Sequence, residues 1–146
     1  MLSAQRQRGW TLIETSLAAA LAAIVAAIAF PSYEAQIVKT RRADAIGALF
    51  RVQMAQERWR ANQPRYGSID EIGAPARSSG GYYALAVTSS SENGYEILAS
   101  AQGRQDRDAD CRHLKLAMRG ADLVQASGPD VAAANPDALN RRCWGL

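Results

Sequence analysis

The chain has 146 residues, which is room for one domain and hardly for a second. Hydrophobic residues make up 48% of the sequence and the formal net charge is +3, so the composition argues against a disordered chain. Two cysteines are too few for a disulfide-dense miniprotein, and the single histidine, His113, leaves most histidine-based metal and triad chemistry without its components.

The first predicted element is an apolar helix from Trp10 to Phe30, in which Glu14 is the one formal charge. At the rise of an α-helix this segment is about 32 Å long, which is enough to cross the hydrocarbon core of a bilayer. The polar leader before it, residues 1–9, carries Arg6 and Arg8 and no acid. The positive-inside rule therefore places the leader in the cytoplasm and everything after Phe30 on the exported side.

Two interpretations of this N-terminus are open. A secretory signal peptide also has a basic start, an apolar core and a small-x-small cleavage site, which Ala27-Ile28-Ala29 would supply. Glu14 argues against it, because a carboxylate at membrane depth costs roughly 2.5–3.5 kcal/mol and is a functional hypothesis by default. The cationic partner that such a carboxylate needs could be a freed backbone amine nearby.

A second, amphipathic helical segment is predicted over residues 31–62. Pro31 lacks a backbone donor and is expected to kink or loosen the helix where the apolar segment ends. Apolar residues then recur at helical spacing, at Ile46, Phe50 and Met54. No strong breaker follows until Asn62-Gln63-Pro64, so residues 10–62 are predicted to form one helix whose second half lays an apolar stripe against a domain.

The remainder, residues 63–146, predicts a small antiparallel sheet. Its first part, residues 63–81, contains two prolines and four glycines and is expected to be an irregular connector. Three or four strands are predicted from the alternation of apolar and polar residues and from β-branched or aromatic content. They are Tyr82–Val87, Tyr95–Ala101, Cys111–Met118 and an optional fourth near Asp122–Ala126. Between and after them are predicted a turn, a charged loop and a proline-punctuated tail: Thr88–Gly94, Gln102–Asp110 and Ser127–Arg142.

The start of the apolar helix resembles the type IV prepilin signature. Gly9 precedes a hydrophobic first mature residue, Trp10, then Thr-Leu-Ile and a glutamate in fifth place, Glu14. The resemblance implies that prepilin peptidase cleaves between Gly9 and Trp10 and that the new amine of Trp10 is methylated. Trp10 departs from the phenylalanine that the family most often has there. The resemblance also implies that Glu14 pairs with the Trp10 amine of its own or an adjacent subunit, setting axial register, and that Pro31 lets the spine loosen during packing.

The rest of the chain is similar to the small minor pilins, the subgroup of PilE and ComP. The shared features are Cys111, the pair Leu114 and Leu116, and the final Cys143-Trp144. They imply an α+β pilin fold with a protruding N-terminal helix on a three- or four-stranded antiparallel sheet. The chain would divide into a leader (residues 1–9), a helix (10–62, of which 10–30 transmembrane and 31–62 amphipathic) and a globular head (63–146).

A disulfide between Cys111 and Cys143 is implied by the same likeness. Both cysteines would lie on the exported, oxidising side, and the bond would close a loop of about 33 residues, worth roughly 3–4 kcal/mol in the chain-entropy model. Two unrelated thiols are the alternative. The neighbouring Trp144 is expected to pack in the core rather than to stack on a ligand.

Catalytic and metal chemistry are not expected. The run Asp106, Asp108 and Asp110 lacks the glycine and the terminal glutamate of a calcium loop, and nearby arginines neutralise it. His113 has no cysteine or carboxylate at metal-ligand spacing, and no Ser/His/Asp arrangement is present. We therefore expect no enzymatic activity, no metal and no cofactor.

Nucleic-acid binding would have to depend on a local basic patch. Without the leader, 15 basic residues face 14 acidic ones, and residues 63–146 hold nine basic and ten acidic residues. A DNA-binding protein depends on cations for its phosphate contacts. The candidates for such contacts are Arg112, Lys115, Arg141 and Arg142, with Arg119 nearby; the alternative is that each arginine pairs with a neighbouring aspartate.

Together these patterns predict a structural minor subunit of a type IV pilus. Its expected partners are other pilin subunits, prepilin peptidase, the inner-membrane assembly machinery and, in one alternative, DNA. It would sit in the inner membrane with its head in the periplasm before assembly and in the extracellular pilus afterwards. The alternatives are a ComP-like DNA-binding minor pilin, a pseudopilin of a type II secretion system and a Sec-processed periplasmic domain.

Overall fold

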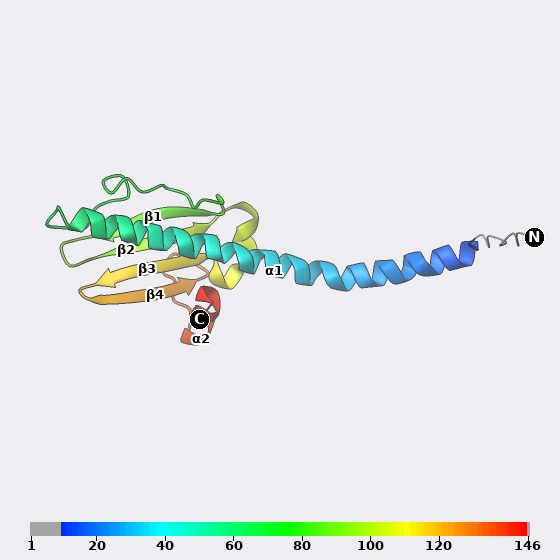
Figure 1. Cartoon of the computed structure of the whole chain (residues 1–146). Helices are drawn as coiled ribbons and strands as arrows, with labels where there is room; N and C mark the ends of the chain where they lie inside the picture. The colour runs from blue at the N-terminus through cyan, green and yellow to red at the C-terminus, as the bar shows by residue number, and fades with distance from the viewer. Residues whose placement is uncertain (1–9, 146) are drawn as a thin grey trace, which may run out of the picture. The chain divides into compact units, whose positions relative to one another are not determined.

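The computed structural model describes residues 10–145, which form two compact units, residues 10–36 and residues 37–145. Gly9, the residue before the predicted cleavage site, lies outside the described residues. Figure 1 shows the order of the elements along the chain.

The longest element is α1 (Leu12–Arg60), a helix of 49 residues whose assignment continues through residue 31. The helix predicted over residues 10–62 is therefore confirmed to within two residues at each end. Part of α1 is long and apolar enough to cross a membrane by length and composition, with a mean hydropathy of 2.1 over 18 residues. The other part, from Ile37 onward, belongs to the second unit and packs in its core.

The second unit contains a four-stranded antiparallel meander, with strands in the order β1-β2-β3-β4. Its strands are β1 (Tyr83–Ser90), β2 (Gly94–Ala101), β3 (His113–Arg119) and β4 (Asp122–Gly128). The fourth strand, predicted only as an option, is present. The architecture is thus the predicted α+β arrangement of a long N-terminal helix and an antiparallel sheet.

One face of the sheet packs against α1. Inward and outward residues alternate along β2 and β3, as expected of strands with one face toward a core. The α1 residues in this core are Ala45, Ala48, Leu49 and Val52, two of them small enough to let the helix approach closely. They pack with buried strand residues from three strands, chiefly Tyr83, Leu85, Ile97, Leu114 and Leu116.

The predicted apolar stripe of α1 was wrong in part. Ile46 packs against this core, but Phe50 and Met54 are 38% and 60% exposed. The reason is that the core-facing side of α1 runs through Leu49 and Val52.

The connector after α1 is irregular, as predicted, and is anchored by a buried glutamine. The Gln56 side chain accepts from the Gly67 N–H at 3.0 Å and donates to the Gly67 carbonyl at 2.7 Å. A Cβ on Gly67 would lie 2.8 Å from Ile72 and 3.1 Å from the Trp59 indole nitrogen. Only glycine therefore allows the connector to approach α1 this closely.

Three predicted boundaries were wrong. The first strand extends to Ser90 through a bulge between Val87 and Ser89, so the turn is shorter than predicted. The third strand begins at His113, because Cys111 ends a short 3₁₀ turn, η2 (Ala109–Cys111), which follows η1 (Gly103–Arg107). The predicted tail instead begins as the end of β4 and finishes in a helix, α2 (Asp137–Trp144).

Candidate functional site

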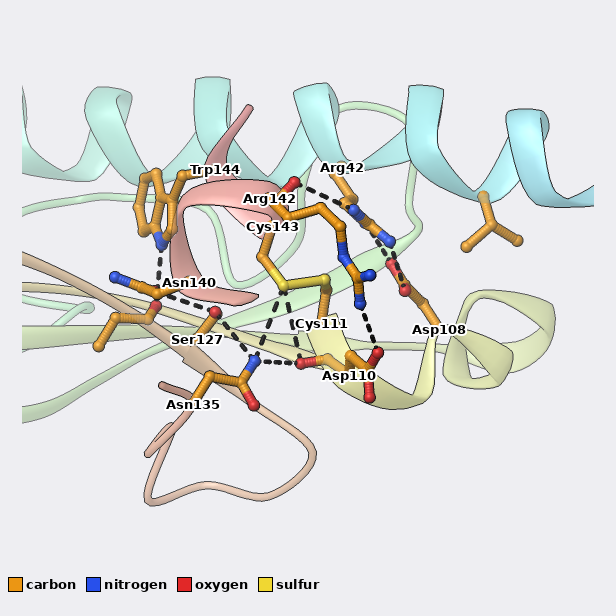
Figure 2. Close-up of a disulfide and its surroundings, with 12 residues drawn as sticks. Arg42, Asp108, Asp110, Cys111, Ser127, Asn135, Asn140, Arg142, Cys143 and Trp144 are labelled. Carbon is orange, nitrogen blue, oxygen red and sulfur yellow. Dashed lines mark hydrogen bonds and ion pairs between the residues drawn. A yellow bond between two sulfur atoms is a disulfide. The ribbon is translucent and has the colours of Figure 1, made fainter. Parts of the chain in front are cut away.

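The sequence candidates in the head centre on a disulfide between η2 and α2. Cys111 and Cys143 are bonded, both are buried, and 32 positions separate them in sequence (Figure 2). The pairing implied by the family likeness is therefore present. It ties the last helix of the chain to the turn that precedes β3.

The α2 helix is placed on β4 by side chains that bond to the strand. Trp144 donates from Nε1 to the Ala126 carbonyl at 3.0 Å, and Asn140 donates to the Gln125 carbonyl at 2.8 Å. Asn140 also accepts from the Ser127 hydroxyl at 3.0 Å. Trp144 is only 5% exposed and belongs to the hydrophobic core, as expected from the sequence.

A buried ion pair joins α1 to the loop that carries the disulfide. Arg42 donates to both carboxylate oxygens of Asp108, from Nε at 2.6 Å and from Nη2 at 2.7 Å, and the two side chains are 14% and 6% exposed. Arg42 also donates to the carbonyl of Arg142 at 3.3 Å, so one guanidinium contacts both α2 and η2 (Figure 2). The sequence does not indicate this pair, because Arg42 and Asp108 are 66 positions apart.

Gln105 extends this buried network into the sheet. Its amide nitrogen lies 3.0 Å from the Tyr83 hydroxyl and 3.0 Å from the Val38 carbonyl, and its side chain is fully buried. Burial raises the pKa of Tyr83 to about 12. The network is structural, because its members bond to one another rather than face an open site.

Each aspartate of the Asp-x-Asp-x-Asp run has an arginine partner from a different part of the head. Asp108 pairs with Arg42, Asp110 with Arg142 at 2.6 Å, and Asp106 with Arg112 at 2.9 Å. Within residues 10–145, no group of three or more His, Cys, Asp or Glu side chains could hold a metal ion. The run serves to join η1 and η2 to their neighbours.

Two of the four DNA-contact candidates lie at the start of β3. Arg112 pairs with Asp106 and donates to the Pro129 carbonyl at 3.4 Å. Lys115 lies 3.2 Å from Glu96 and 3.2 Å from the Ala132 carbonyl. Both cations hold the segment after β4 in place, which leaves little of their charge for a ligand.

The other two candidates lie on α2. Arg142 pairs with Asp110, whereas the Arg141 side chain is exposed and makes no bond to another residue in the described range. Three of the four candidates therefore have carboxylate partners, but Lys115 pairs with a glutamate and Arg142 with an aspartate 32 positions away, rather than with neighbouring aspartates. Of these four cations, Arg141 alone has no carboxylate partner within residues 10–145.

His113 is half-buried on the face of the sheet away from α1. Its Nδ1 lies 3.0 Å from the Ser100 hydroxyl, and burial together with the nearby Arg112 charge lowers its pKa. This histidine has the features of a packed, hydrogen-bonded residue.

An open cleft that the sequence did not indicate lies at the β1–β2 turn. It has a volume of about 390 Å³ and is lined in part by Ser89, Ser91, Asn93 and Arg119. The Arg119 side chain makes no bond within residues 10–145. Guanidinium, hydroxyl and amide groups are the side chains that most often contact phosphates.

The assembly candidates lie in the first unit. Trp10 is 72% exposed, and Glu14 is exposed with no side-chain partner among the described residues. The backbone N–H of Glu14 donates to the Thr11 hydroxyl at 3.3 Å, so Thr11 caps the start of α1. Residue 31 lies within the helix, well after this start.

Comparison with known families gives one match. A family model described as type IV minor pilin ComP, DNA uptake sequence receptor, matches residues 31–115, which is more than half of the chain. The match covers most of α1 beyond the apolar segment, β1, β2, both 3₁₀ turns and the start of β3. Among curated proteins none is similar enough to the chain to count as a match.

Proposed function

The chain belongs to the family of the type IV minor pilin ComP, and from this premise we propose that it is a structural subunit of a type IV pilus. Prepilin peptidase removes residues 1–9, and the mature chain begins at a methylated Trp10. Residues 10–30 hold it in the inner membrane with the head in the periplasm, and the subunit then enters the extracellular filament. Family membership favours this role over a secretion pseudopilin or a Sec-processed periplasmic domain.

One observation supports the proposal most directly: no described residue covers the large apolar side chains of residues 10–30. The large apolar side chains of this segment are 56–90% exposed: Trp10, Leu12, Ile13, Leu17, Leu21, Ile24, Val25, Ile28 and Phe30. A water-soluble protein does not leave so large an apolar surface exposed. Lipid can cover it before assembly, and the same segments of neighbouring subunits can cover it in a filament, where alanine-rich faces allow close approach.

Glu14 gives this packing a fixed register. Within an apolar bundle a carboxylate without a cation is costly, and the amine of Trp10, from the same or an adjacent subunit, is the nearest cation that processing would create. A subunit out of register would leave both charges without a partner.

Glu14→Val should therefore leave cleavage intact but lower recovery of the chain in sheared pili by at least about tenfold, because breaking a buried ion pair costs about 3–5 kcal/mol. Quantitative immunoblotting of the pilus fraction measures this. Glu57→Val, which makes the same substitution at an exposed acid of α1 outside the apolar segment, is the matched control and should assemble normally. Equal recovery of the two variants would contradict the role of Glu14.

A second function, DNA binding, is favoured by the cleft at the β1–β2 turn. It combines an unneutralised arginine, Arg119, with hydroxyl and amide groups, and the matching family is described as a DNA uptake sequence receptor. Arg141 is a second free cation, on α2. Against it stands the pairing of Arg112, Lys115 and Arg142 with carboxylates, which limits the number of phosphates that the head can neutralise.

With few phosphate contacts, the full chain in detergent is expected to lose non-specific duplex binding by about 0.15 M salt. If it is a sequence receptor, one genomic duplex will outcompete its scrambled version at that salt in a gel-shift assay. Arg119→Gln and Arg141→Gln should then each lower the slope of log affinity against log salt by about one. Lys115→Gln should change that slope little, because the Lys115 cation is already paired with Glu96. If no duplex is bound selectively, the sequence-receptor function is contradicted and the structural role remains.

A further inference from the structure

The charge of the second unit is concentrated at one end. We define the basic end as residues 37–43 of α1, residues 103–112 and residues 137–145. These three segments are held together by the pair between Arg42 and Asp108, the bond from Arg42 to the Arg142 carbonyl, and the bond from Gln105 to the Val38 carbonyl. They carry eight lysines and arginines against four aspartates, whereas the remainder of residues 37–146 carries seven basic and eight acidic residues.

Several cations of the basic end are available to a ligand. The side chains of Lys39, Arg104 and Arg141 make no bond to other residues in the described part of the chain, and all three residues are exposed. The four aspartates of the basic end are Asp106, Asp108, Asp110 and Asp137, and three of them already pair with arginines. The unneutralised charge at this surface is therefore positive.

A small apolar pocket adjoins one of these cations, Lys39. It has a volume of about 170 Å³, and its walls include Ile46, Cys143 and Trp144, with Lys39, Arg42 and Arg142 also in its lining. Figure 2 shows Trp144 and Arg142 on α2 and Arg42 on α1, with the bond from Arg42 to the Arg142 carbonyl. Cys143 and Trp144 are buried, and Arg42 and Arg142 are paired with aspartates, so the exposed cation of this pocket without such a partner in the described chain is Lys39. A lysine can lay its aliphatic stem along apolar surface while its ammonium group reaches a lipid phosphate.

The covalent chain keeps the basic end close to the membrane. Lys39 is nine residues after Phe30, the last residue of the apolar segment. Even fully extended, nine residues span at most about 32 Å, and as a helix about 14 Å. This limit holds for any arrangement of the two units, so the cations cannot move far from the headgroups of the leaflet where the span ends.

We propose that the basic end docks on anionic phospholipid headgroups at the exported face of the membrane and holds the head against the bilayer until the subunit is drawn into the filament. The inference rests on the proposed insertion of residues 10–30. DNA phosphates have similar chemistry, but the chain itself keeps these cations near the lipid surface, whereas DNA would have to diffuse to them. Because the attraction is electrostatic and contributed cation by cation, extraction of the subunit would break it in small steps.

The test uses the full chain in phosphatidylcholine vesicles with spin-labelled phosphatidylglycerol or spin-labelled phosphatidylcholine as the probe lipid. Electron paramagnetic resonance gives the relative association of the two probes with the protein. Two double variants each remove two cations that have no bonds within residues 10–145. Lys39→Gln with Arg141→Gln alters the basic end, and Arg58→Gln with Arg77→Gln is the matched control elsewhere on the head.

The native chain is expected to prefer the anionic probe at about 0.01 M salt and to lose that preference at about 1 M, where the Debye length falls to about 3 Å. The basic-end variant should lose most of the preference, since each cation near an anionic surface is worth about a factor of five. The control should keep it. Arg6 and Arg8 of the leader are present in all three chains and cannot cause a difference between them.

Equal loss in the two variants, or no preference in the native chain, would overturn the docking surface. A basic-end variant that keeps its lipid preference but loses duplex binding in a gel shift would also overturn it, assigning the surface to nucleic acid. Alkaline extraction is measured first: a chain that washes out of the vesicles refutes membrane insertion, and with it the docking, whereas one that stays but shows no preference refutes the docking alone.

Discussion

A chain with Gly9→Val is expected to keep its leader and to be excluded from pili. The proposed peptidase cleaves after a small residue, and the branched side chain of valine would not fit where glycine does. The uncleaved chain also keeps Arg6 and Arg8 ahead of the apolar segment, and it lacks the Trp10 amine that Glu14 needs. Intact-mass analysis of the membrane fraction gives the start of the chain.

Gly9→Ala is the matched control, and it should be processed in part because alanine is nearly as small as glycine. A Gly9→Val chain that begins at Trp10 would contradict processing by a prepilin peptidase. A native chain that begins at Phe30, after the small-x-small site of Ala27 and Ala29, would instead identify the apolar segment as a secretory signal peptide.

The second large effect is expected from Arg42→Ala, which should lower the free energy of unfolding of the head by about 3–5 kcal/mol. The substitution leaves the Asp108 carboxylate buried without its cation and removes the contact from α1 to the Arg142 carbonyl. Urea unfolding of the detergent-solubilised chain, followed by tryptophan fluorescence, measures the change, since Trp59 and Trp144 belong to the folded head.

Two further variants separate the ion pair from a general effect of changing α1. Arg51→Ala removes an exposed arginine of the same helix that bonds only to the Ser79 hydroxyl, and it should cost less than about 1 kcal/mol. Arg42→Met combined with Asp108→Leu removes both charges and should cost clearly less than Arg42→Ala alone. If the double variant is the less stable of the two, the charge left without a partner is not the cause.

Local patterns predicted most of the fold. The long helix follows from an uninterrupted apolar run and from apolar residues at helical spacing, although Phe50 and Met54 of the predicted stripe are exposed. The strands follow from the alternation of apolar and polar residues between turn residues. The α2 helix was missed because eight residues with little apolar content give no helical periodicity. Its signals were at its ends: Pro136 before it, Asp137 in its first turn, and Gly145 after it with a φ of 75°.

Contacts between distant residues could not be predicted. Arg42 and Asp108 are 66 positions apart, and nothing in either local sequence indicates the other. Sequence analysis expected the aspartate run to be neutralised by arginines beside it, but two of its three partners come from α1 and α2. The pairing of the DNA-contact candidates could not be predicted for the same reason. Whether an arginine has a carboxylate partner or none within residues 10–145, as for Arg119 and Arg141, depends on contacts in the folded chain.

Sheared and washed pili offer the most direct measurement of whether this chain is a filament subunit. Mass spectrometry of the protein recovered from them should find the chain beginning at an N-methylated Trp10, with Cys111 and Cys143 protected from alkylation by their disulfide. Absence of the chain from pili, together with a soluble periplasmic form that begins at Phe30, would contradict the filament role.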